Sequence, residues 1–134
     1  MTQKNIIISH RDFLALAVDV NASVTKVNGT DFNSLELDVR PLCGYGVITV
    51  TFTRAAGGAS EIEFYFQVSN DEGVTWSTVE YLKIGYPTNS VAVSNVVRGP
   101  KPVIVDAITH IRLWKIVNGD AVNNCTACNA NLSL

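Results

Sequence analysis

The chain has 134 residues with a formal net charge of −2, and only 16% of its residues are charged. This length fits one domain, and the charge balance gives no field that would attract nucleic acid or an anionic membrane. No apolar run approaches the ~20 residues of a membrane-spanning helix, and no secretory signal is recognisable, so we expect a soluble protein made in a cytoplasm.

The first twenty residues leave two alternatives open. Residues 1–10 contain Ile6, Ile7 and Ile8 between polar residues, which suits either an N-terminal arm that packs on a neighbour or an edge strand of the domain itself. Residues 11–134 show no repeat and no linker and are predicted to form a single domain. Within residues 11–20, Asp12 is placed to cap a helix, but the end of the segment alternates like a strand, and we favour a strand.

From residue 35 onward apolar residues recur with a period of two, which is typical of strands with one buried and one solvated face. Turn residues such as Gly57-Gly58 separate these runs at short intervals. The sequence therefore predicts an all-β domain, an antiparallel β-sandwich or jelly roll of about eight strands. The rows predicted to share a face are Leu35, Leu37 and Val39; Ile48, Val50 and Phe52; Ile62, Phe64, Phe66 and Val68; Ile111, Leu113, Lys115 and Val117; and Cys128, Ala130, Leu132 and Leu134.

The sharpest local motif is Ser69-Asn70-Asp71-Glu72-Gly73-Val74-Thr75-Trp76. It resembles the Asp-box found on hairpins of sialidases and related β proteins, where the motif usually lies away from the active site. We predict a structural turn in which Asp71 accepts hydrogen bonds from backbone N–H groups, Gly73 is left-handed, and Trp76 packs on the hairpin base. Ser69 and Thr75 belong to the same turn, which joins strands over 64–69 and 75–84.

A binding surface is predicted on the two arms of this hairpin. Tyr65 and Tyr81 fall on opposite arms and are candidates for cross-strand neighbours. Such a pair forms either a small platform for a sugar ring or an ordinary aromatic pair covered by a partner subunit, and the sequence leaves both readings open.

Residue types that carry catalysis or metal binding show no familiar arrangement. Cys125 and Cys128 have the C-x-x-C spacing, but zinc needs a second ligand pair and a redox motif needs a helix start, so we interpret both as small core residues. His10 and His110 accompany no nucleophile motif, and no phosphate-binding glycine loop is present. We therefore expect no enzyme, no metal and no cofactor.

Two stretches, Phe64 to Trp76 and Ile108 to Ala121, resemble hairpins and closing strands of small bacteriophage virion β-sandwich proteins. The resemblance implies a non-enzymatic capsid decoration or cement protein on the exterior of the virion. Its partners would be the major capsid protein and further copies of itself, in a trimer or another small cyclic assembly. The alternative is a carbohydrate- or receptor-binding module, as in a tail fibre, with glycans as ligands.

Overall fold

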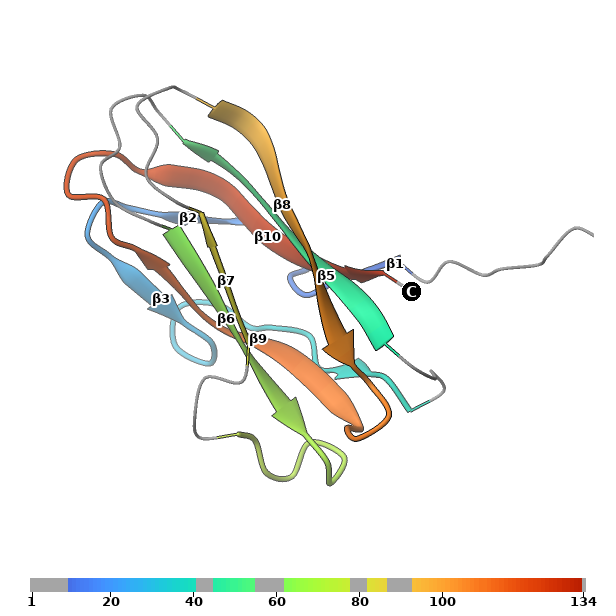
Figure 1. The fold of residues 1–134 in the computed structure, drawn as a ribbon. Helices are drawn as coiled ribbons and strands as arrows, with labels where there is room; N and C mark the ends of the chain where they lie inside the picture. Colours follow the sequence, from blue (N-terminus) through green and yellow to red (C-terminus); the bar gives the residue numbers. More distant parts are fainter. Residues whose placement is uncertain (1–9, 41–44, 55–61, 78–81, 87–92, 134) are drawn as a thin grey trace, which may run out of the picture.

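The computed structural model describes residues 10–40, 45–54, 62–77, 82–86 and 93–133, and these contain ten β-strands and no helix. Every strand pair is antiparallel, and the strands form two sheets that pack face to face (Figure 1). The predicted all-β sandwich is therefore confirmed. The strand number exceeds the predicted eight because four strands near the N-terminus have only two or three residues each.

Sheet A has the order β1-β10-β5-β8, and β2 pairs with β10 as well. Sheet B has the order β3-β9-β6-β7, and β4 pairs with β9 as well. The strands of sheet A are β1 (His10–Asp12), β2 (Val18–Val20), β5 (Tyr45–Arg54), β8 (Val93–Ile104) and β10 (Cys125–Ser133); those of sheet B are β3 (Thr25–Val27), β4 (Leu37–Asp38), β6 (Ile62–Ser69), β7 (Leu82–Tyr86) and β9 (His110–Asn118).

The segment over residues 11–20 contains parts of two short strands and no helix, in agreement with the favoured prediction. β1 begins at His10 and pairs with the last residues of β10, so that His10 lies opposite Ser133. The rest of the predicted arm, residues 1–9, lies outside the described residues.

Aromatic side chains join the two sheets. Phe52 of sheet A lies 6.1 Å from Phe64 of sheet B, and Phe13, which follows β1, lies 5.1 Å from Phe66, measured between ring centroids. All four are at most 1% exposed. Burial of one such side chain stabilises the fold by about 1.5–3 kcal/mol. The two-residue alternation of β5 and β6 turns these rings inward and in this way produces the core.

The predicted faces of β9 are wrong beyond Leu113. Ile116 is fully buried, whereas Lys115 is only partly buried. In the ladder with β6, Lys115 pairs with Tyr65 and Leu113 pairs with Phe66, which leaves Trp114 as an extra residue. Such a β-bulge shifts the alternation by one residue, and it brings Trp114 and Lys115 to the outer face of sheet B.

A second irregularity explains why both cysteines of the C-x-x-C motif point into the core. The register of β10 shifts between Thr126 and Asn129, and Ala127 has a φ of 53°. Cys125 and Cys128 are both completely buried as free thiols. Leu35, by contrast, is 47% exposed, so its predicted place on a buried row is wrong, because β4 begins only at Leu37.

One end of the sandwich is closed by buried polar groups. The Arg54 guanidinium donates to the Asp120 carboxylate at 2.6 Å, with side chains only 1% and 3% exposed. Asp120 also accepts hydrogen bonds from the backbone N–H groups of Val122 and Asn123, which hold its pKa well below the usual range. Asn118 donates to three backbone carbonyls, among them that of Val20. This network fixes the turn between β9 and β10.

Candidate functional site

The loop between β6 and β7 is a self-contained hydrogen-bonded turn. The Asp71 carboxylate accepts from the backbone N–H of Thr75 at 2.9 Å and from the Thr75 hydroxyl. The Ser69 hydroxyl donates to Asp71 at 2.6 Å and accepts from the N–H of Gly73, which has a φ of +82°. The hydroxyl groups of Ser69 and Thr75, together with the Thr75 N–H, lower the pKa of Asp71 to about 2. Asp71 is thus held as an ionised structural acceptor.

Trp76 is clamped between this loop and sheet B. Its indole Nε1–H donates to the carbonyl of Gly73 at 3.1 Å, and the Arg112 guanidinium lies 4.1 Å from the ring centroid. Arg112 donates twice to the side-chain carbonyl of Gln67, and Gln67 donates to the carbonyl of Ser77. Burial lowers the pKa of Arg112, although the negative charge of Glu36 acts in the opposite direction and raises it. The clamp gives the loop one fixed position on the sheet.

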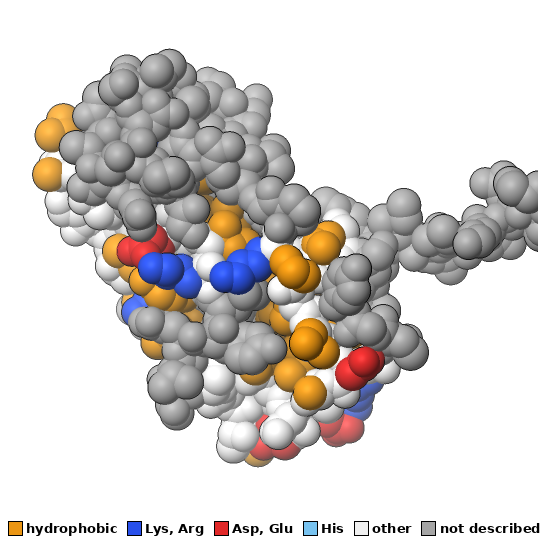
Figure 2. Space-filling view, viewed as in Figure 1, with side chains coloured by type: hydrophobic (Ala, Val, Ile, Leu, Met, Phe, Trp, Pro, Cys, Tyr) orange, Lys and Arg blue, Asp and Glu red, His pale blue; other side chains and the backbone are white. Residues whose placement is uncertain are grey.

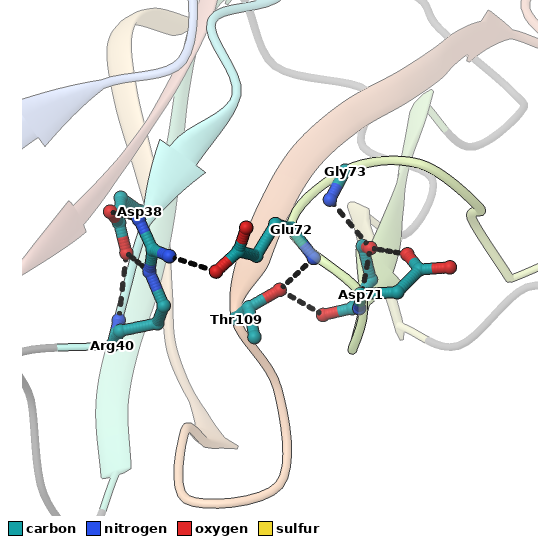
Figure 3. A network of polar contacts seen from close by, with 7 residues as sticks. Asp38, Arg40, Asp71, Glu72, Gly73 and Thr109 are labelled. Carbon is teal, nitrogen blue, oxygen red and sulfur yellow. Dashed lines mark hydrogen bonds and ion pairs between the residues drawn. The ribbon is translucent and has the colours of Figure 1, made fainter.

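A second set of contacts ties the loop to its neighbours (Figure 3). The Thr109 hydroxyl, just before β9, accepts from the N–H of Glu72 and donates to the carbonyl of Ser69. Arg40 forms ion pairs with Asp38 and Glu72, and its hydrogen bonds hold the pKa of Asp38 far below the usual range. These side chains are 36–65% exposed, so the ion pairs add little stability, and the Thr109 bonds are the firmer link.

An open hollow of about 290 Å³ lies between this loop and the turn from β8 to β9. Val68, Trp76, Ala107 and Ile108 supply its apolar lining. Figure 2 shows hydrophobic side chains gathered around the end of β8 and the turn that follows it, with Lys and Arg side chains beside them.

Tyr65 lies on the outer face of sheet B, but its cross-strand neighbours are Lys83 of β7 and Lys115 of β9. Lys115 Nζ lies 4.6 Å from the Tyr65 ring centroid, and the ring of Trp114 stands at 81° to that of Tyr65. The second member of the predicted platform, Tyr81, lies outside the described residues. The described part of this face is therefore an aromatic–cation cluster rather than a row of coplanar rings.

Cys125 and Cys128 are enclosed in the core, and burial keeps their thiols protonated. Burial raises the pKa of Cys125 to about 11 and raises that of Cys128 further above its usual value. Within the described ranges, no group of three or more His, Cys, Asp or Glu residues is arranged to hold a metal ion. The same ranges contain no helix that is long and apolar enough to cross a membrane.

Sequence reasoning missed the residues that attach the loop to the sheet, namely Gln67, Thr109 and Arg112. Their partners depend on the register between β6 and β9, which no local pattern reveals. Arg54 was also missed. It follows Phe52 by two residues in β5, so the same alternation that places Phe52 in the core also predicts a buried Arg54.

No protein-family model matches the chain, and neither a curated protein nor a solved structure matches it. The resemblance to phage virion proteins therefore stays a prediction.

Proposed function

We propose that this protein is a structural subunit of a virus particle, of the capsid decoration or cement type, which binds the exterior of the shell through protein–protein contacts. The observation that supports this proposal is that the buried polar side chains bind loops and turns. Among the side chains that the structure describes, the buried polar or charged ones hydrogen-bond to loops or turns: Arg54, Gln67, Ser69, Asn118 and Asp120. These buried hydrogen bonds thus hold the loops in one conformation.

Fixed loops suit a protein that presents a constant surface to its neighbours, because little conformational entropy is lost on binding. The edge of sheet A supports contact through faces and loops rather than through added strands. Pro102 lies in edge strand β8 opposite Val47 and has no N–H to offer to an incoming strand.

The direct test is immunogold electron microscopy of purified particles from the source of the sequence, with antibodies against the purified chain. We expect regular labelling of the shell, and mass spectrometry should find the chain in stoichiometric amounts. Its absence from particles while it is abundant in the same lysate would overturn the proposal. Size-exclusion chromatography with light scattering tests the expected trimer, and a strict monomer at high concentration would contradict that part.

A second candidate function is a carbohydrate- or receptor-binding module, and the hollow beside Trp76 favours it. A glycan array with the purified chain separates the two candidates. Glycan binding that is abolished by Tyr65→Ala would place the ligand on the outer face of sheet B, which is one of the two readings that the sequence left open.

A further inference from the structure

We propose that the hollow beside Trp76 binds a single neutral sugar ring of a glycan. This inference develops the second candidate function, and it is independent of whether the protein binds a viral shell. It places the ligand at the end of the sandwich, away from Tyr65.

The apolar part of the hollow is rigid before any ligand arrives. Trp76 is held by its bond to the Gly73 carbonyl and by the Arg112 guanidinium over its ring. Ile108 packs partly against the core, and Ala107 beside it is exposed. A fixed indole with aliphatic neighbours offers a surface on which the C–H groups of a sugar ring pack without ordering the protein.

The polar residues of the lining are Ser69, Asn70, Thr75 and Ser77. The hydroxyl groups of the other three already take part in hydrogen bonds of the loop, so the Asn70 carboxamide is the main polar group for a ligand. Asn70 is exposed, and no hydrogen bond of its carboxamide is seen among the described residues. A carboxamide donates and accepts at once, as sugar hydroxyls require. The lining that the structure describes includes no charged residue, which favours a neutral ligand over an anionic one.

The size of the hollow limits the ligand. Its volume of about 290 Å³ is at the lower end of ligand pockets, which span roughly 300–1,000 Å³. One ring with few polar contacts should bind weakly, with a dissociation constant on the order of 1 mM. Useful affinity for a glycan-covered surface would then require several copies of the protein acting together.

The outer face of sheet B is a poorer sugar site. Lys115 Nζ lies 4.6 Å from the centroid of the Tyr65 ring and 4.4 Å from that of Trp114, and the two rings are nearly perpendicular. The perpendicular rings offer no common plane on which one sugar ring could stack. Trp114 therefore serves as an internal reference for binding at Trp76.

The test is a nuclear magnetic resonance titration of the ¹⁵N-labelled full chain with methyl glycosides of glucose, galactose, mannose and N-acetylglucosamine. We expect at least one glycoside to shift the indole N–H of Trp76 and the amides of Asn70 and Ala107 in a saturable manner, while the indole of Trp114 stays in place. No shift with any of them at tens of millimolar would overturn the proposal. Shifts at Trp76 with N-acetyl-leucinamide but with no glycoside would overturn it in favour of a protein ligand.

Two variants locate the site without touching the hydrogen bonds of the loop. Asn70→Ala removes the carboxamide and should weaken binding about tenfold. Ala107→Phe fills the hollow and should abolish the shifts at Trp76, while the rest of the spectrum shows that the chain is folded. Tyr65→Ala is the matched control and should bind as the parent chain does. Binding that survives Ala107→Phe and is lost in Tyr65→Ala would refute the assignment.

Discussion

Replacement of Asp120 by alanine is expected to lower the free energy of unfolding by about 3–5 kcal/mol. The Asp120 carboxylate lies 2.6 Å from Arg54 Nη2, and both side chains are almost completely buried. Two further nitrogens of the guanidinium, Nε and Nη1, have no hydrogen-bond partner among the described residues, so no described group other than Asp120 is in place to balance the charge. The backbone N–H groups of Val122 and Asn123 and the carboxamide of Asn123 lose their acceptor too, but Val122 is 81% exposed and Asn123 is only partly buried, so water can replace the carboxylate there. The unpaired guanidinium therefore dominates the cost.

Urea denaturation followed by circular dichroism measures this loss of free energy. In a thermal scan the same loss should lower the melting temperature by roughly 10–20 °C. The matched control is Glu72→Gln, which removes an exposed ion pair with Arg40 and should cost less than about 1 kcal/mol. The double variant Arg54→Met with Asp120→Ala should be more stable than Asp120→Ala alone, because no charge is left buried without a partner. A cost below about 1 kcal/mol for Asp120→Ala, or a double variant no more stable than the single one, would refute the reasoning.

Three further outcomes are expected. Gly73→Ala should lower the free energy of unfolding by about 1–2 kcal/mol, because Gly73 has a φ of +82°; an unchanged urea midpoint would contradict this. The chain has a third cysteine, Cys43, which is replaced by serine so that labelling reports on Cys125 and Cys128 alone. In this background the two thiols should not react with a thiol reagent until denaturant is added, since both are buried and both have raised pKa values. Rapid labelling of the folded chain would contradict this. The pKa of Asp71 is lowered from 3.8 to about 2, so the stability that its carboxylate contributes should be complete above about pH 5 and be lost as the pH falls toward 2. Urea midpoints measured across this pH range should decline in the parent chain and decline less in Asp71→Asn.

The features that were predictable from the sequence are those whose partners lie close in the chain. The alternation of β5 and the first half of β6 depends only on neighbouring residues, and both runs form the core as predicted. The loop from Ser69 to Trp76 contains its own donors and acceptors within seven positions, so its hydrogen bonds also follow from a local motif.

The features that were not predictable depend on how distant strands are aligned. The bulge at Trp114 follows from the pairing of β9 with β6, and it reverses the predicted faces of Lys115 and Ile116. The stacking of Arg112 on Trp76 joins residues 36 positions apart. No pattern in either segment reveals the other, because a one-residue change in register would place Arg112 on the opposite face of the sheet.

The two kinds of contact have different consequences for function. The local bonds of Asp71 and Ser69 determine the shape of the loop, and the long-range bonds of Thr109 and Arg112 determine where that shape sits on sheet B. The hollow depends on both sets of bonds, since its lining comes from the loop and from the turn that carries Thr109. A loop fixed twice in this way loses little entropy when a neighbour or a ligand binds beside it. For this reason the surface around Trp76 suits recognition better than the outer face of sheet B, where the rings of Tyr65 and Trp114 stand nearly perpendicular to each other.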